Sequence, residues 1–249
     1  MAKSTKSRRK SEVSVRLNPE LDREACRESF GRDRRVHIRD VLAYESAQRI
    51  LECLESEVTW NLVFNEGLKH HDLRPNQLAA MSPKQEATIM AHVNQGARDG
   101  FQYLYHSYPM YDSYRDGNDP GHYLHTVHEF INSEPMLDFV RAVTGFDDIA
   151  YADSQATLYG PGHFLTRHND DVEGKSRRCA YIFNFTPRWR PDWGGLLEFV
   201  DADGHVSGGL VPSFNALNLL AVPFDHYVSY VAPYAGGKRY SITGWFRYR

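Results

Sequence analysis

Apolar residues in the first half of the chain recur with the period of an α-helix. Over residues 44–56 they fall at i, i+3, i+4 and i+7, which places them on one helical face. Ser82, followed by a proline and then by Gln85, has the pattern of a capping box and predicts a second helix start. A third apolar stripe begins near Ser133 and ends at Gly145, a typical C-terminal stop. The first half therefore predicts helices.

From about residue 150 the pattern changes to short runs typical of β-strands, separated by Gly, Pro and Asp. The runs are "ATLYG" (156–160), "CAYIFNF" (179–185), "GLLEFV" (195–200), "ALNLLAV" (216–222), "YVSYVA" (227–232) and "YSITGWFRY" (240–248). "DADG" at 201–204 predicts a hairpin turn. Without helices between them, such runs favour an antiparallel sandwich or barrel over a parallel sheet.

Chain length and composition favour one large domain. The 249 residues are 41% hydrophobic and 13% aromatic, which is enough for a real core. We expect a helical part over 36–149 and a β core over 150–249. No apolar run is long enough to cross a bilayer, and the first ten residues lack the apolar stretch of a secretory signal. Three scattered cysteines indicate neither disulfides nor a paired zinc site, so a cytoplasmic location is expected.

The N-terminus differs in charge from the rest of the chain. Five of the first ten residues are lysine or arginine and none is acidic, although the whole chain has a net charge of -3. Residues 1–35 are predicted to be a basic, flexible segment. Contact of this segment with nucleic acid or a ribosome stays open, and no function is assigned to it.

The stretch "TRHNDD" (166–171) carries the first candidate metal ligands. If it is a strand, His168 and Asp170 share a face, whereas Asp171 points away. An H-x-D pair alone is weak evidence. A second histidine, His226 in "HYV", would complete the His/His/carboxylate set that non-haem Fe(II) oxygenases use, which leaves metal positions open for a co-substrate and dioxygen.

Other histidines compete for the second position. His205 follows the predicted "DADG" turn, where an exposed polar side chain is the ordinary expectation. His163 lies five residues before His168, so odd spacing places it on the opposite face. The remaining candidates lie in the helical half or in the loops before the sheet and are expected to be structural or exposed: His70, His71, His92, His106, His122, His125 and His128.

An arginine in the last predicted strand offers an anion receptor. Arg239 alternates in step with Ser241, so both can face the same interior. A guanidinium can bind a carboxylate through two hydrogen bonds, and its burial without such a partner is costly. Metal ligands and an anion receptor are thus expected in one sheet.

Together these motifs resemble the 2-oxoglutarate and Fe(II)-dependent dioxygenases of the prolyl 4-hydroxylase-like group. The resemblance covers residues 150–249 and rests on "LYGPGHFLTRHND", "RRCAYIFNFTPRW" followed by "DWGGLLEF", "HYVSYV" and "RYSITGWF", in this order. The last motif and the helical first half are most similar to prolyl hydroxylases that act on proteins of the translation machinery.

The resemblance implies a double-stranded β-helix, or jelly roll, flanked by α-helices. It implies His168, Asp170 and His226 as Fe(II) ligands and Arg239 as the residue that binds the distal carboxylate of 2-oxoglutarate. Tyr159 matches a tyrosine beside the co-substrate, although packing in the sheet explains it equally well, and Ser241 could support the same carboxylate. The implied reaction uses O2, decarboxylates 2-oxoglutarate to succinate and hydroxylates a prolyl residue in a protein, with ascorbate as a reductant for oxidised iron.

The chain departs from the family pattern at two places. The basic residue often lies closer to the distal histidine, whereas Arg239 follows His226 by 13 residues. Many relatives have tyrosine, leucine and asparagine where this chain has Asn184, Phe185 and Thr186. Arg177 and Arg178 end a loop that lies near the substrate entrance in similar enzymes, and solvated charges are the expected explanation for both.

Two other functions stay open at this point. The same iron centre hydroxylates free amino acids and other small molecules in other branches, because one fold hosts many functions. A non-catalytic jelly-roll binding module is the second alternative. A degenerate module should have lost a ligand, whereas all three ligands and the arginine are present.

Overall fold

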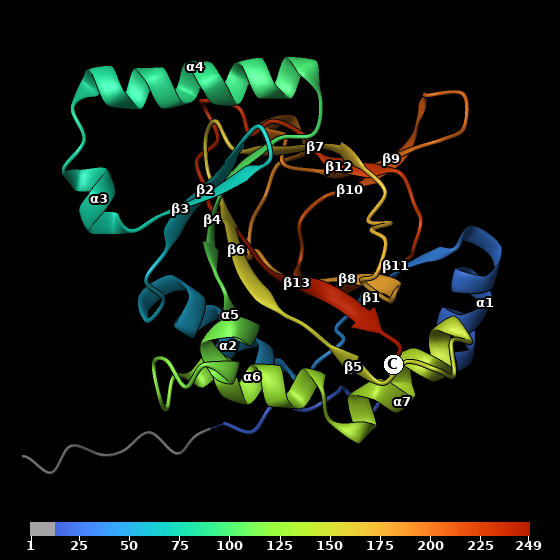
Figure 1. The fold of residues 1–249 in the computed structure, drawn as a ribbon. Coiled ribbons are helices and arrows are strands. Elements are labelled where there is room, and N and C mark those ends of the chain that lie inside the picture. The colour runs from blue at the N-terminus through green and yellow to red at the C-terminus, as the bar shows by residue number, and fades with distance from the viewer. Residues whose placement is uncertain (1–12) are drawn as a thin grey trace, which may run out of the picture.

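The computed structural model describes residues 13–249 (Figure 1). The basic residues of the first ten lie outside this range, so their contact with nucleic acid or a ribosome stays open. The α-helices are α1 (Arg23–Asp33), α2 (Tyr44–Ser56), α3 (Pro75–Ala79), α4 (Pro83–Asp99), α5 (Met110–Arg115), α6 (Tyr123–Ile131) and α7 (Glu134–Thr144), with a 3-10 turn at Pro191–Trp193. Within residues 13–249, no helix combines the length and apolar character needed to span a membrane.

All strands belong to one curled antiparallel sheet. They are β1 (Arg35–Arg39), β2 (Asn61–Glu66), β3 (Lys69–Leu73), β4 (Tyr103–Tyr108), β5 (Tyr151–Ala152), β6 (Gln155–Tyr159), β7 (Phe164–His168), β8 (Arg177–Phe185), β9 (Leu197–Val200), β10 (Val206–Leu210), β11 (Phe214–Ala221), β12 (His226–Val228) and β13 (Arg239–Arg247). The main order is β1-β11-β8-β13-β6-β4-β7-β12-β9-β10. In Figure 1 this sheet closes almost into a barrel.

The three helices predicted from apolar periodicity are confirmed. Helix α2 covers Tyr44–Ser56 and buries its apolar stripe. Helix α4 begins after Ser82, whose side chain accepts a hydrogen bond from the Gln85 amide in the predicted capping box. Helix α7 ends at Gly145, which has the left-handed conformation expected of a C-terminal glycine. Local sequence was sufficient here because each signal lies within one or two helical turns.

Residues 13–35 differ from the expected flexible segment. Asp22 caps the start of helix α1, because its carboxylate accepts from the Ala25 amide. Phe30 on this helix is buried and packs against Phe146 with the two rings nearly perpendicular. The expectation is therefore wrong for Arg23–Asp33, because one buried aromatic and a cap hold a helix that is otherwise polar. The boundary at 150 is also not a sheet boundary, since β1 pairs with β11 and β4 pairs with β6 and β7.

The main core lies between the helices and the outer face of the sheet. Helices α2, α5, α6 and α7 lie along one side of the curled sheet, and α4 lies on the opposite side (Figure 1). The core includes Ile50 and Leu54 of α2, Phe139 of α7 and Ile242 and Phe246 of β13. A second cluster beneath α4 packs Val93 against strands β2, β4 and β7. The inner face of the sheet is thereby left available for a site.

Replacing Gly244 with alanine is expected to destabilise the protein by about 1–3 kcal/mol, because overpacking a close contact forces the backbone apart. A Cβ atom at this position would lie 2.3 Å from the backbone oxygen of Asp153. Urea unfolding measures the change. Gly31→Ala in α1 is the matched control, since its Cβ would meet nothing within 4 Å, and it should stabilise by about 0.5–1 kcal/mol. Equal unfolding midpoints for both variants would contradict the close contact.

Candidate metal and co-substrate site

A pocket of about 1150 Å³ lies inside the curled sheet. One wall is β13, whose alternate residues line the pocket: Arg239, Ser241, Thr243, Trp245 and Arg247. The residues between them include Tyr240, Ile242 and Phe246, which face the helical core. Strand alternation therefore separates a polar inner face from an apolar outer face on one strand, as predicted for Arg239 and Ser241.

Two histidines meet in this pocket from neighbouring strands. His168 is the last residue of β7 and His226 is the first residue of β12, and the two residues are direct partners in the strand pairing. His168 Nδ1 lies 2.9 Å from the Thr166 carbonyl oxygen, and His226 Nδ1 lies 2.7 Å from the Phe224 carbonyl oxygen. A carbonyl can only accept, so each Nδ1 carries the proton and each Nε2 is free for a metal.

Asp170 joins the histidines through a turn rather than through strand alternation. Strand β7 ends at His168, and Asp170 has a φ of 65°, in the left-handed region that aspartate tolerates better than most residues. Asn169 holds this turn, because its side-chain oxygen accepts from the Asp171 amide and its carbonyl accepts from the Phe224 amide. The sequence analysis placed His168 and Asp170 on one side by strand alternation, whereas in the structure the turn at Asp170 brings them together.

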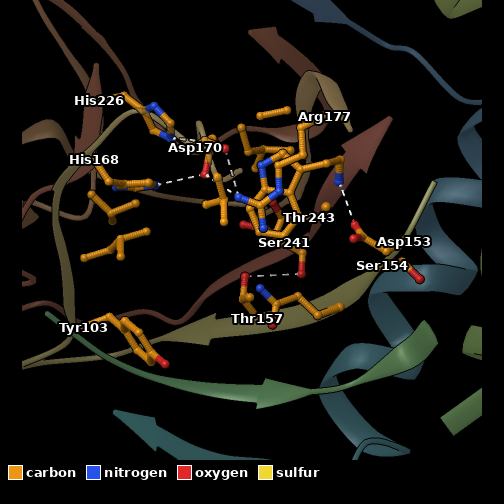
Figure 2. Close-up of a pocket in the computed structure, with 18 of the residues that line it drawn as sticks. Tyr103, Asp153, Ser154, Thr157, His168, Asp170, Arg177, His226, Ser241 and Thr243 are labelled. Carbon is orange, nitrogen blue, oxygen red and sulfur yellow. Dashed lines mark hydrogen bonds and ion pairs between the residues drawn. The ribbon is translucent and has the colours of Figure 1, made fainter. Parts of the chain in front are cut away.

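The three side chains form a group of metal-ligand geometry, and Figure 2 shows both histidines pointing toward Asp170. Its carboxylate oxygens lie 3.5 Å from His168 Nε2 and 3.5 Å from His226 Nε2, and all three ligand atoms lie within 4.8 Å of one another. Burial, followed by the proximity of His226, lowers the pKa of His168, which favours the neutral ligand form. Two neutral imidazoles and one carboxylate fit Fe(II).

Arg239 lies at the start of β13, opposite Tyr159 of β6, and is almost fully buried. Its Nε has no hydrogen-bond partner, and within residues 13–249 no carboxylate forms an ion pair with it. Its guanidinium carbon lies 4.8 Å from the centre of the Tyr159 ring. Burial lowers the pKa of Arg239, because the charged form loses its hydration. A buried cation without an anion indicates a receptor for a ligand carboxylate.

The other two predicted co-substrate residues are beside Arg239. Ser241 is buried and its Oγ has no hydrogen-bond partner within residues 13–249, so it can donate to the same anion. Tyr159 is buried, lines the pocket and stacks on Tyr105 with ring centres 5.0 Å apart. Tyr159 therefore both packs in the sheet and lines the pocket. Thr157, the direct partner of Ser241 in the pairing of β6 with β13, also lines the pocket but was not predicted. Its alternation with Tyr159 on β6 was the available signal.

The competing residues do not belong to the metal-ligand group found within residues 13–249. Asp171 is exposed, and His205 is exposed after the "DADG" turn, where its backbone amide donates to Asp201. His163 is buried but packs against His106, with ring centres 4.9 Å apart, and neither belongs to the metal-ligand group. Asn184 pairs with Ser241 across β8 and β13 but does not line the pocket. The chain therefore presents Thr157, Ser241 and Tyr159 near Arg239.

Arg177 and Trp245 are pocket residues that sequence reasoning missed. Arg177 was expected to be a solvated loop charge, but it begins β8, and only 13% of its side chain is exposed. Its Nη1 donates to the Asp170 carbonyl oxygen at 3.0 Å, and its guanidinium carbon lies 3.5 Å from the centre of the Trp245 ring. The expectation for Arg177 is wrong because a distant strand supplies the stacking indole. Arg178 is half-buried and paired with Asp148.

The buried His163 side chain is expected to make the stability of the fold decrease at acidic pH. Burial, with His106 as the second cause, lowers the pKa of His163 to about 4, below the usual value of 6.5. His163 Nδ1 accepts from the Gly160 amide, which requires the unprotonated nitrogen. The unfolded chain binds this proton first, so the contribution is present above pH 6.5 and is lost as the pH falls toward 4, by about 3 kcal/mol.

Chemical unfolding of His163→Asn between pH 4 and 7 tests this contribution. Asparagine keeps an acceptor but does not titrate, so stability should vary less with pH than in the parent protein. His205→Asn, at an exposed position, is the control and should leave the pH dependence of the parent. Identical pH dependence in the parent and in His163→Asn would show that His163 is not the titrating group.

Comparison with known proteins gives two findings. Residues 154–247 match the family model of the 2OG-Fe(II) oxygenase superfamily. No curated protein sequence matches the chain. The matched range contains His168, Asp170, His226 and Arg239, whereas the helical first half lies outside it.

Solved structures share the fold. An oxidoreductase of the 2OG-Fe(II) oxygenase family from Burkholderia pseudomallei is 10% identical with a TM-score of 0.59 and covers 95% of both chains. A prolyl hydroxylase from Trichoplax adhaerens, in complex with a peptide fragment of the hypoxia inducible factor oxygen degradation domain, is 14% identical with a TM-score of 0.58, covering 90% of this chain and 88% of that one. A prolyl 4-hydroxylase from Phytophthora capsici is 14% identical with a TM-score of 0.56, and the match covers 91% of this chain and 62% of that one. The predicted jelly roll flanked by helices is confirmed.

Proposed function

We propose that this chain, whose residues 154–247 match the 2OG-Fe(II) oxygenase superfamily, is an oxidoreductase that hydroxylates an unactivated C–H bond of a prolyl residue in a protein. 2-Oxoglutarate is decarboxylated to succinate in the same reaction. The observation that supports this proposal most strongly is the pairing of a His/Asp/His group with a buried, anion-free arginine in one pocket.

His168, Asp170 and His226 hold the Fe(II). Each imidazole is fixed by the hydrogen bond from its Nδ1 to a backbone carbonyl, so its Nε2 lone pair is aimed before the metal arrives. Arg177 holds the backbone of Asp170 by a hydrogen bond to its carbonyl oxygen. Bound Fe(II) supplies dioxygen activation and the oxidative decarboxylation of 2-oxoglutarate. The protein contributes the ligand set and its orientation.

Arg239 and Ser241 bind the distal carboxylate of 2-oxoglutarate. A carboxylate there removes the cost of the buried guanidinium and supplies acceptors for Arg239 Nε and Ser241 Oγ, both of which have none. The stacked rings of Tyr105 and Tyr159 are buried beside them and exclude water from the co-substrate. Ascorbate would restore ferrous iron after unproductive oxidation.

A protein substrate is favoured over a free amino acid by the size of the pocket. Its volume of about 1150 Å³ exceeds the range of about 300–1,000 Å³ that suits a single drug-sized ligand. Two of the similar structures are prolyl hydroxylases, and one of these contains a bound peptide. The likeness of "RYSITGWF" to hydroxylases of translation-machinery proteins makes those proteins the first substrates to test.

Turnover of 2-oxoglutarate tests the reaction class. Protein that is loaded with Fe(II) under nitrogen and then exposed to air should convert 2-oxoglutarate to succinate, and ascorbate should prolong the conversion. Mass spectrometry of cellular proteins with and without the gene then identifies substrates as prolines that lose the mass of one oxygen atom when the gene is absent. Iron-loaded protein that binds 2-oxoglutarate but never forms succinate would instead support a non-catalytic binding module.

A further inference from the structure

Gln102 is a buried amide side chain that joins three elements of the fold. It lies between the end of helix α4 and the start of strand β4. Its Oε1 accepts from the backbone amides of Asn65, at 2.9 Å, and Tyr103, at 2.8 Å, and its Nε2 donates to the Asn65 carbonyl oxygen at 2.7 Å. A Cβ atom at Gly96 would lie 2.6 Å from Gln102 Nε2, so α4 packs directly on this amide. Gln102 therefore connects β2, β4 and α4.

The Gln102 amide extends the pairing of β2 with β4. The two strands pair as far as Phe64 and Leu104. Beyond this pair, the Gln102 side chain binds both backbone groups of Asn65. A side-chain amide can replace a strand here because, like a peptide group, it carries a donor and an acceptor. Without it, these backbone groups would lose their hydrogen-bond partner, which is rare for buried polar groups.

Gln102 also holds the strand that carries His168. Its backbone amide donates to Thr166 Oγ1 at 2.8 Å, and its carbonyl oxygen accepts from the Thr166 amide at 2.9 Å. Thr166 Oγ1 in turn donates to the Gly100 carbonyl oxygen at 3.3 Å. The pairing of β4 with β7 ends one residue earlier, so Gln102 extends this pairing toward His168.

Thr166 makes the hydrogen bond that orients the metal ligand. Its carbonyl oxygen lies 2.9 Å from His168 Nδ1, and Figure 2 shows the His168 ring pointing toward Asp170. The partner of Nδ1 sets the direction of Nε2. Phe101, the residue before Gln102, packs against the same imidazole with ring centres 5.5 Å apart. Residues 101 and 102 therefore restrain His168 through a ring contact and through a chain of hydrogen bonds.

We propose that Gln102 and Thr166 are positioning residues for the iron ligand His168. They fix the Thr166 carbonyl, and this carbonyl holds the imidazole in the direction that binds metal. A ligand held in place before the metal arrives binds more tightly than one that must be ordered on binding. Gln102 lies outside residues 154–247, so the first half of the chain contributes to the metal site. This inference rests on the proposed function, because it requires that His168 binds Fe(II).

The Thr166 hydroxyl allows a direct test with Co(II), a neighbour of iron that prefers similar ligands. Thr166→Val keeps the shape of the side chain and removes the acceptor of the Gln102 amide. The dissociation constant for Co(II) should rise about tenfold, the lower end of the effect of losing a ligand's partner, because the Thr166 carbonyl itself remains. Thr166→Ser keeps the hydroxyl and should restore most of the affinity. Calorimetry with the full chain measures both.

The absorption bands of bound Co(II) give a second measurement, because their position and intensity depend on the geometry of the ligands. They should shift in Thr166→Val and return toward those of the parent protein in Thr166→Ser. A side chain that only stabilises the fold would change the unfolding temperature and leave these bands unchanged.

Gln102→Met removes the amide and keeps the length of the side chain, so it should also weaken Co(II) binding and shift the bands. Asn132→Leu is the matched control. The Asn132 amide binds both backbone groups of Ala152, at 2.8 Å and 3.1 Å, as Gln102 binds Asn65, but neither Asn132 nor Ala152 lines the pocket. Both variants should lower the unfolding temperature of the metal-free protein, and only Gln102→Met should change Co(II) binding.

Three outcomes would overturn the role of Gln102 and Thr166. They are unchanged Co(II) affinity and bands in Thr166→Val, an equal loss in Thr166→Val and Thr166→Ser, and an effect of Asn132→Leu on Co(II) binding as large as that of Gln102→Met. If Gln102→Met does not fold, the two Thr166 variants decide. A parent protein that binds no Co(II) would contradict the metal site of the proposed function, and this inference with it, so the two failures are distinguishable.

Discussion

Replacing Asp170 with alanine is expected to abolish 2-oxoglutarate turnover and to weaken Fe(II) binding by more than about 100-fold, since losing only the partner of a metal ligand already costs about 10- to 100-fold. Asp170 supplies the only carboxylate of the metal-ligand group found within residues 13–249. Without it, two neutral imidazoles remain to hold a dication. Calorimetric titration with Fe(II) under nitrogen and a succinate assay measure both effects, and His168→Ala should behave alike.

The second histidine has a direct control within the chain. His226→Ala should lose iron binding and turnover, whereas His205→Ala, at an exposed position, should retain both. Persistent turnover in His226→Ala together with loss in His205→Ala would show that the wrong histidine was assigned. Loss in both variants with normal unfolding curves would indicate a different metal site.

Replacing Arg239 with methionine is expected to raise the dissociation constant for 2-oxoglutarate by about 100-fold, because removing one partner of a buried ion pair costs about 2–5 kcal/mol. Methionine keeps part of the apolar stem and removes the charge and all donors. Binding is measured under nitrogen with Mn(II) in place of iron. Arg167→Met provides the control, because its exposed guanidinium already has a carboxylate partner.

A co-substrate analogue tests the pairing itself. 2-Oxovalerate keeps the keto acid group that faces the metal but lacks the distal carboxylate. The parent protein should prefer 2-oxoglutarate to 2-oxovalerate by about 100-fold, and Arg239→Met should bind both with similar, weak affinity, since the charge that discriminates them is gone. If Arg239→Met still preferred 2-oxoglutarate as strongly, another residue would hold the distal carboxylate.

Helices α2, α4 and α7 and six of the thirteen strands were predictable because their signals are local. The capping box at Ser82 and the apolar stripe of α2 each lie within a few turns. The run 240–248 of alternating residues likewise predicted most of β13 and placed Arg239 and Ser241 on one side. Strands β1 and β4 were missed because their hydrogen-bond partners, β11 and β6, lie far away in the chain.

The sequence alone also identified candidate site residues that lie in one pocket of the structure. His168, Asp170, His226 and Arg239 were selected by residue type, spacing and resemblance, and the structure places all four in one pocket. The reason given for Asp170 was incomplete, because strand alternation does not extend past His168 and a left-handed turn brings the carboxylate round. Residue chemistry is carried by the sequence, but turn geometry depends on contacts such as that between Asn169 and Phe224.

Only the tertiary structure decided what Arg177, Trp245 and Asp153 do. In the sequence Arg177 ends a charged loop, which ordinarily means solvent, and nothing near it indicates burial. Its stacking indole lies 68 positions away on β13, and the carboxylate that fixes this indole's backbone comes from the segment before β6. Local propensity determines which elements form, whereas the pairing of distant strands determines which side chains are buried together and left without partners.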